Sequence, residues 1–72
     1  MDISIIIPLL NEEASLNELH QWISKVMKSN GYSYELIFID DGSKDLSWSI
    51  ITKLASENTE VNGIRFLENF GK

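Results

Sequence analysis

The pattern of hydrophobic and polar residues predicts two strands in the first forty residues. The first, Ile3–Leu9, contains three consecutive isoleucines and is apolar on both faces, as in a strand that helices cover on both sides. Pro8 has no backbone N–H to give to a sheet, so we expect it at the end of this strand. The second predicted strand is Tyr34–Asp40, an apolar run that stops at two adjacent aspartates.

A helix is predicted between these strands. Ser15 and Glu18 have the spacing of a capping box, in which the two side chains accept hydrogen bonds from free backbone N–H groups. The apolar residues that follow keep the three-and-four spacing of a helix: Leu16, Leu19, Ile23, Val26 and Met27. Asn30 and Gly31 then predict a helix end in the left-handed conformation.

A second helix is predicted after the second strand. Ser43 or Asp45 can cap its N-terminus, because short polar side chains accept hydrogen bonds from the free N–H groups there. Its buried stripe is predicted to consist of four apolar residues: Leu46, Ile50, Ile51 and Leu54.

The last predicted element is a third strand, Val61–Leu67, in which Ile64 and Phe66 share one face and Val61 could lie outside. The element order is therefore strand, helix, strand, helix, strand. Because crossovers between parallel strands are right-handed, this order predicts a parallel three-stranded sheet with strand order 3-2-1. The fold class is α/β, and residues 1–72 correspond to the first half of a Rossmann-like nucleotide-binding domain.

Charge and composition narrow the function. The 72 residues carry a formal net charge of −5, and none of them is cysteine. An acidic surface argues against nucleic acid or an anionic membrane as a partner, because both need a basic face. Disulfides and cysteine metal sites are excluded. We see no basic leader and no long apolar run, so we expect no secretory signal or membrane span, which favours a cytoplasmic location.

Candidate chemistry lies in two polar loops, Pro8–Glu13 after the first strand and Asp40–Ser43 after the second. Ligands of open parallel sheets bind beyond the carboxyl ends of the strands, so we expect the four carboxylates of these loops to converge on one crevice. A donor-rich ligand or a cation would relieve their repulsion. Each loop alone also fits a structural role, since Asp-Asp-Gly-Ser is a common turn and Asn-Glu-Glu suits the first turn of a helix.

Several named motifs are absent. The chain contains neither G-x-G-x-x-G nor G-x-x-x-x-G-K-[ST]. Asp40–Ser43 differs from the D-x-D-G-[TS] loop of haloacid-dehalogenase-type phosphatases, because Ile39 stands where that loop needs aspartate. His20, the single histidine, has no partner at metal-binding spacing, and we interpret it as a surface or packing residue.

Three segments together resemble family 2 glycosyltransferases with the GT-A fold. Ile5–Glu13 looks like the I-I-P-x-[YL]-N-E-E opening of that family, and Phe38–Asp45 resembles its V-D-D-G-S-x-D loop. Arg65–Lys72 is similar to the R-N-F-G-K segment after the third strand. This last segment leans towards the branch that acts on polyprenyl phosphate, with its dolichol-phosphate mannose synthase-like and bactoprenol glucosyltransferase-like enzymes. The resemblance covers essentially the whole chain.

The resemblance implies a nucleotide-sugar-binding site formed by six residues: Pro8, Leu10, Glu12, Ile39, Asp41 and Gly42. In the first loop, Pro8 and Leu10 would flank the base, and Glu12 would accept a hydrogen bond from the ribose. Leu10 departs from the tyrosine common at its position, so apolar contact would replace stacking on the base.

In the second loop, the backbone of Ile39 would lie against the base and Asp41 would accept a hydrogen bond from a base N–H. A carboxylate suits the imide of uracil and the amino and imino groups of guanine, so the donor would be a UDP- or GDP-sugar. Gly42 would let the backbone come close to the ligand, because it has no Cβ.

The resemblance places the transfer chemistry outside this chain. The family carries a D-x-D motif after its fourth strand, where carboxylates hold Mg²⁺ or Mn²⁺ against the donor diphosphate. We expect that motif, the general base and the acceptor site beyond Lys72, so no catalytic or metal-binding residue is predicted within the chain. The 72 residues alone are predicted to be inactive, and to self-associate through the open apolar edge of the sheet.

These inferences predict the N-terminal donor-binding part of an inverting hexosyltransferase, with a UDP- or GDP-sugar as donor and polyprenyl phosphate as the candidate acceptor. The longer protein would act at the cytoplasmic face of the membrane, in the synthesis of cell-envelope polysaccharide. Two alternatives stay open. The chain could be a non-catalytic nucleotide-binding or self-assembling module, or half of an unrelated α/β enzyme such as a phosphotransfer domain.

Overall fold

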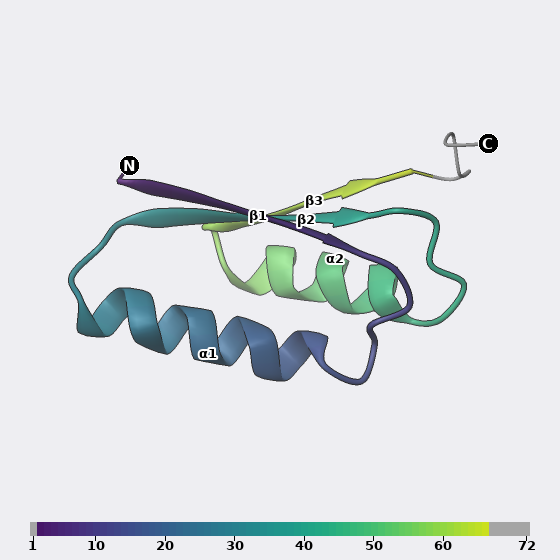
Figure 1. Cartoon of the computed structure of the whole chain (residues 1–72), viewed down its shortest axis with the longest axis horizontal. Helices are drawn as coiled ribbons and strands as arrows, with labels where there is room; N and C mark the ends of the chain where they lie inside the picture. The colour runs from purple at the N-terminus through teal and green to yellow at the C-terminus, as the bar shows by residue number, and fades with distance from the viewer. Residues whose placement is uncertain (1, 67–72) are drawn as a thin grey trace.

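The computed structural model describes residues 2–66 and shows an open sheet with two helices (Figure 1). The elements follow the predicted order: β1 (Ile3–Leu9), α1 (Leu16–Ser29), β2 (Tyr34–Asp40), α2 (Ser47–Glu57) and β3 (Val61–Arg65). β2 lies in the middle of the sheet and pairs in parallel with both neighbours, which confirms the α/β class and the predicted strand order. In this part of the chain, neither helix has the length and apolar character needed to cross a membrane.

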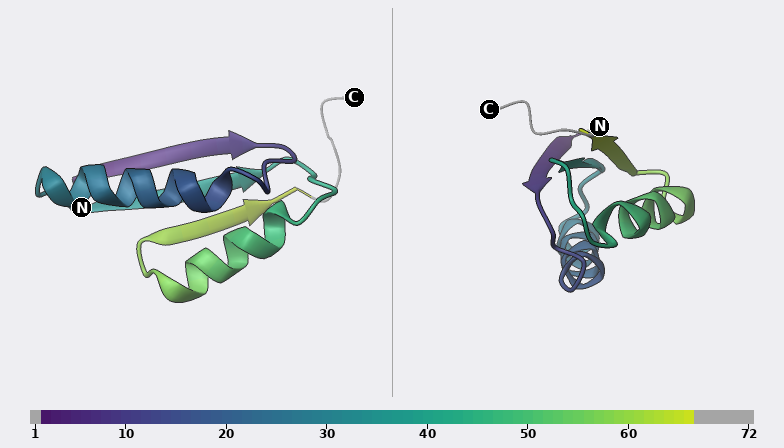
Figure 2. Two further views of the ribbon diagram at one scale, coloured as in Figure 1. Left: turned by 90° about the horizontal axis from the view of Figure 1, so that it is seen from below. Right: turned by 90° about the vertical axis from the view of Figure 1, so that its right-hand side faces the viewer.

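Both helices cover the same face of the sheet, as perpendicular views show (Figure 1, Figure 2). Two right-handed crossovers that step in the same direction place both helices on one side. Ile5 and Ile7 of β1 pack against the core on that side, whereas Ile6 between them is 59% exposed. The expectation that helices cover both faces of β1 is therefore wrong for residues 2–66.

The core lies between the sheet and the helices, and the central strand contributes most to it. Leu36 and Phe38 of β2 are fully buried. Tyr34 of β2 also belongs to the core, and the remaining core residues come from the other four elements: Leu9, Leu16, Ile23, Ile51, Leu54 and Val61. The predicted helical stripes are confirmed except at Leu46, which precedes α2 and is 61% exposed.

The end of α1 is the left-handed cap that the sequence predicts. Gly31 has a φ of 71°. Its N–H donates to the carbonyl of Lys28 at 3.2 Å, and the N–H of Tyr32 donates to the carbonyl of Met27 at 3.1 Å. This pair of bonds is the Schellman arrangement, in which the glycine avoids the strain that a Cβ would bring.

The start of α1 differs from the prediction. Ser15 occupies the N-cap position but makes no side-chain cap hydrogen bond, so the capping box with Glu18 does not form. Its hydroxyl donates instead to Glu12, to the carbonyl oxygen at 3.3 Å and to Oε2 at 3.0 Å. Ser15 therefore stabilises the loop before α1 instead of capping the helix.

The start of α2 also differs. The N-cap position is Leu46, which has no side chain able to cap. Asp45, one residue earlier, accepts the N–H of Ser47 at 2.9 Å, so it performs part of the predicted capping role from outside the helix. Ser43, the other predicted cap, accepts a hydrogen bond from the first loop instead.

The third strand ends earlier than predicted. Val61 lies inside it and is buried, while the strand stops at Arg65. Ile64 and Phe66 are both exposed, at 48% and 42%. Leu67, and the family-like segment that continues to Lys72, lie outside the described residues.

Candidate functional site

The two loops leave neighbouring strand ends side by side, as the sequence predicts. Leu9 and Asp40 are Cα partners at the carboxyl ends of β1 and β2, and Pro8 pairs with Ile39 one step before them. The N–H of Asp41 then donates to the carbonyl of Leu9 at 3.0 Å, which extends the pairing by one more residue. The sheet thus fixes where each loop begins.

Beyond the strand ends, side chains bind one loop to the other. The hydroxyl oxygen of Ser43 accepts the N–H of Asn11 at 2.8 Å, and that of Ser47 accepts the N–H of Glu12 at 2.9 Å. In return, the N–H of Lys44 donates to Oδ1 of Asn11 at 2.8 Å. Asn11 has a φ of 53°, a left-handed conformation in which asparagine is several-fold enriched.

Asp45 and Glu13 extend this connection. Oδ2 of Asp45 accepts the N–H of Glu13 at 3.2 Å, and Oε1 of Glu13 accepts the N–H of Leu46 at 3.4 Å. Desolvation acts to raise the pKa of Asp45, but hydrogen bonds from the hydroxyl and N–H of Ser47 and from the N–H of Glu13 favour the carboxylate, and the pKa lies below its ordinary value. The two loops therefore behave as one hydrogen-bonded unit.

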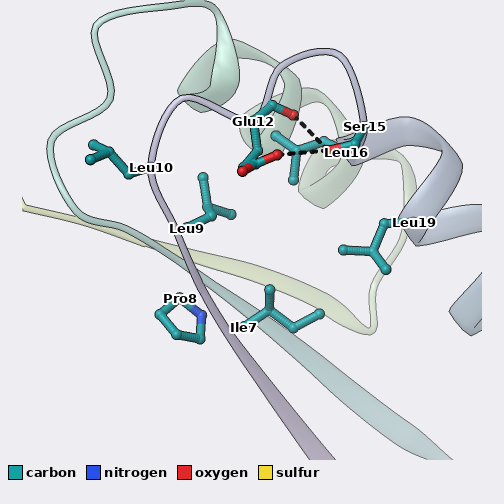
Figure 3. A pocket seen from close by; sticks show the side chains of 8 residues that line it. All are labelled: Ile7, Pro8, Leu9, Leu10, Glu12, Ser15, Leu16 and Leu19. Carbon is teal, nitrogen blue, oxygen red and sulfur yellow. Dashed lines mark hydrogen bonds between the residues drawn. The ribbon is translucent and has the colours of Figure 1, made fainter.

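Three of the six predicted binding residues line one hollow. Pro8, Leu10 and Glu12 are among the residues that line an open space of about 410 Å³ beside the end of β1, although the side chains of Pro8 and Leu10 lie on the other side of the strand from Ile7 and Leu9 (Figure 3). The rest of its lining is mostly apolar: Ile7, Leu9, Ser15, Leu16 and Leu19. The Ser15 hydroxyl holds Oε2 of Glu12, while Leu10 is 52% exposed. The hollow therefore offers apolar walls and one carboxylate.

The other three predicted residues do not line this hollow. Ile39 is half-buried in β2 and is the register partner of Pro8. Asp41 is exposed just past the end of β2. Gly42 has a φ of 85°, and a Cβ there would lie 3.6 Å from the carbonyl oxygen of Phe66. The left-handed backbone rather than lack of space makes glycine the favoured residue at this position.

The expected convergence of four carboxylates does not occur. Asp40 is fully buried, because the alternation of β2 turns its side chain to the helix-covered face. Its Oδ1 accepts the N–H of Ser43 at 2.8 Å. Within residues 2–66, no group of three or more acidic, histidine or cysteine side chains is placed to hold a metal ion.

His20 is a packing residue, one of the two roles that the sequence allowed. It is 8% exposed in α1, with Nε2 at 4.0 Å from Oε2 of Glu60. The same carboxylate oxygen accepts the hydroxyl of Tyr34 at 3.4 Å.

Sequence reasoning missed the serines that join the loops. The sequence predicts Ser43 as a turn residue or a helix cap and predicts no role for Ser47, yet both are buried and each accepts a backbone N–H of the first loop. The spacing of Asp40 and Ser43 is a usable signal, because aspartate side chains commonly accept N–H groups two or three residues on. Ser47 carries no signal that separates it from the exposed Ser49 of the same helix.

Comparison with known proteins gives the family. Residues 4–72 match the model of glycosyl transferase family 2. The chain is 38% identical over its full length to a bactoprenol glucosyl transferase of Shigella phage SfV, of which it covers 24%. It is 46% identical over 71 residues to an undecaprenyl-phosphate 4-deoxy-4-formamido-L-arabinose transferase of Shewanella sediminis (strain HAW-EB3), covering 97% of this chain and 22% of that protein. The chain thus spans under a quarter of the length of these relatives. It belongs to glycosyl transferase family 2.

Proposed function

We propose that the chain is the donor-binding part of a hexosyltransferase that uses a UDP- or GDP-sugar. The observation that carries this proposal is the placement of Glu12 and Asp41 on two hydrogen-bonded loops at the carboxyl ends of neighbouring parallel strands. Crevices at this end of open parallel sheets are where nucleotides bind.

The chemistry of the two loops suits a nucleoside. Pro8 and Leu10 provide apolar contact for the flat base, beside a hollow that also holds Glu12. A carboxylate such as Asp41 can accept from a base N–H, and Glu12 can accept from a ribose hydroxyl. Gly42 and the backbone of Ile39 then leave room for close approach of the base.

The acceptor and the metal belong to the longer protein in this proposal. The names of two relatives, a bactoprenol glucosyl transferase and an undecaprenyl-phosphate 4-deoxy-4-formamido-L-arabinose transferase, support polyprenyl phosphate as the acceptor. We propose in addition that the longer protein acts at the cytoplasmic face of the membrane, in the synthesis of cell-envelope polysaccharide. Mg²⁺ or Mn²⁺ would stabilise the leaving diphosphate. The carboxylates that would hold it are expected beyond Lys72, so the 72 residues alone should transfer no sugar. Detectable sugar transfer by this chain would contradict that expectation.

A titration of the ¹⁵N-labelled chain with UDP and with GDP, followed by NMR, tests donor binding. We expect the amide signals of Glu12, Asp41 and Gly42 to shift with one of the two nucleotides. Asp41→Asn should weaken binding by about tenfold, because the base N–H would then donate to a neutral amide oxygen instead of a charged carboxylate. Glu57→Gln, a change at an exposed acid of α2, is the matched control. Shifts that spread evenly over the chain, or none with either nucleotide, would overturn the proposal.

We also propose that the isolated chain self-associates through the free edge of the sheet, along β1. The N–H of Ile3 and the carbonyl of Leu9 both form hydrogen bonds on the β2 side of β1. Because backbone groups alternate in direction along a strand, those of Ser4 and Ile6 point to the free edge of β1. Pro8 offers no N–H there, which confines pairing to the first half of the strand. The partner in this pairing is the β1 strand of a second copy of the chain, which has the same free edge.

A further inference from the structure

Within the proposed donor site, we infer that Ser43 and Ser47 are positioning residues that set the spacing between Glu12 and Asp41 before any nucleotide binds. The inference rests on the proposed function, and it concerns two side chains that would not touch the ligand. It starts from the separation of the two halves of the site, which lie in chain segments joined by the whole of α1 and β2.

The sheet alone does not position Glu12. Register pairing ends at Leu9 and Asp40, and the first loop runs on through Asn11 in a left-handed conformation before α1 begins. A loop without further contacts samples many conformations, and a ligand that orders it loses affinity through the entropy of ordering. Contacts other than those of the sheet must therefore fix the conformation of residues 11 and 12.

Two buried hydroxyls do this. Ser47 is 0% exposed and Ser43 is 7% exposed, and their oxygens accept the N–H groups of Glu12 and Asn11 at 2.9 and 2.8 Å. Both hydrogen bonds are partly buried, and losing one would leave a buried serine site without its partner and the loop N–H without its acceptor. The two serines thus fix consecutive peptide units of the first loop.

The serines are themselves held by Asp40 at the end of β2 and by Asp45 in the loop before α2. The N–H of Ser43 donates to the buried carboxylate of Asp40 at 2.8 Å, and the N–H of Ser47 donates to Asp45 at 2.9 Å. One path of hydrogen bonds therefore runs from Asp40 at the end of β2 through Ser43 to the backbone of Asn11. A second path runs from Asp45 through Ser47 to the backbone of Glu12. The Ser15 hydroxyl then holds the Glu12 carboxylate at 3.0 Å.

This arrangement assigns a preorganising role. With both paths intact, Glu12 and Asp41 stand at a fixed separation, and a nucleoside that contacts both meets a site already in place. Without one hydroxyl, the first loop has to be ordered by the ligand. We expect each serine-to-alanine change to weaken nucleotide binding by about five- to tenfold, the effect of one lost hydrogen bond.

The test compares four variants of the chain in the same NMR titration with UDP and GDP. Ser43→Ala and Ser47→Ala should bind more weakly, whereas Ser43→Thr, which keeps the hydroxyl, should bind like the unchanged chain. Ser49→Ala makes the same chemical change at an exposed serine of α2 and should have no effect. Equal binding by all variants would overturn the inference and leave the proposed function standing. No binding by the unchanged chain would instead overturn the proposed function.

Hydrogen exchange of the unchanged chain tests the inference even where an alanine variant fails to fold. The amides of Asn11 and Glu12 should exchange much more slowly than in an unstructured peptide, because each is bonded to a buried acceptor. In Ser47→Ala, the Glu12 amide should lose this protection selectively, while the amides of β2 keep theirs. Exchange of the Asn11 and Glu12 amides at the unprotected rate in the unchanged chain would overturn the inference.

Discussion

The carboxylate of Asp40 accepts the backbone N–H of Ser43 at 2.8 Å through Oδ1, whereas its Oδ2 is buried and has no hydrogen-bond partner within residues 2–66. The first oxygen closes the turn that carries Asp41 and Gly42. The second is a buried polar atom whose desolvation is not repaid by a hydrogen bond there. The two oxygens of one side chain therefore have opposite effects on stability.

Substitutions at Asp40 should separate these effects. Asp40→Ala should lower the free energy of unfolding by about 1–3 kcal/mol, because the buried N–H of Ser43 loses its acceptor. Asp40→Asn keeps an Oδ1 acceptor and removes a buried charge, so we expect it to cost clearly less. Urea unfolding followed by circular dichroism measures both. An asparagine variant as unstable as the alanine variant would contradict this account of the turn.

Gly63 of β3 is a second position where a small change should have a large effect. A Cβ at this residue would lie 2.5 Å from Cγ2 of Ile51 and within 3.2 Å of the Trp48 ring. Gly63→Ala should therefore destabilise the chain by about 1–3 kcal/mol through overpacking between β3 and α2. Asn62→Ala, at an exposed neighbour in the same strand, is the control for urea unfolding. Equal stability of the two variants would show that α2 moves freely away from the sheet.

Much of the fold could be predicted because local sequence patterns determine where its strands and helices end. The bounds of β1 and β2 follow from apolar runs that stop at Leu9 and Asp40, and the structure confirms both. The end of α1 follows from Gly31, since its left-handed conformation has a strong residue preference. The single uncovered face of the sheet could not be read in this way. Ile6 looks buried in the sequence, but the two right-handed crossovers place both helices on the opposite face of the sheet.

The sequence predicts the location of the site better than it predicts the contacts within the site. Parallel strands bring Glu12 and Asp41 to one end of the sheet, and this follows from topology alone. The burial of Asp40 follows from strand alternation, but the paired aspartates hide which of the two faces the core. The role of Ser47 depends on a long-range hydrogen bond from Glu12, whereas that of Ser15 depends on a local bond to the same residue. A capping-box spacing could not reveal that the Ser15 hydroxyl would turn to Glu12 instead.

Asp45 should make the free energy of unfolding of the chain depend on pH in the acidic range. Its pKa in the folded chain lies below the ordinary value of 3.8, so folding favours its charged form. The stabilising contribution is therefore fully present above pH 3.8 and is lost as the pH falls through the lower folded value. Asp45→Asn should flatten the fall in unfolding free energy at acid pH.

Urea unfolding at a series of pH values from about 6 down to about 2 measures this dependence. Glu57→Gln, at an exposed acid of α2, is the control and should leave the acid slope closer to that of the unchanged chain. If Asp45→Asn and the unchanged chain lose stability in parallel, the hydrogen bonds from Ser47 and Glu13 do not favour the carboxylate as described.

The uncovered face of the sheet should strengthen the self-association that we propose through the free edge of β1. Ile6 and Ile64 are 59% and 48% exposed on β1 and β3, and contact between two such faces would remove apolar surface from water. The double change Ile6→Thr and Ile64→Thr keeps β-branched side chains that suit strands while lowering the hydrophobicity of the face. We expect the unchanged chain to form dimers or larger species at millimolar concentration in sedimentation velocity, and the double variant to be largely monomeric. Leu46→Thr, at a 61% exposed leucine outside the sheet, is the control and should associate like the unchanged chain. A monomeric unchanged chain at that concentration, or equal dissociation of the control, would rule out this face as the contact surface.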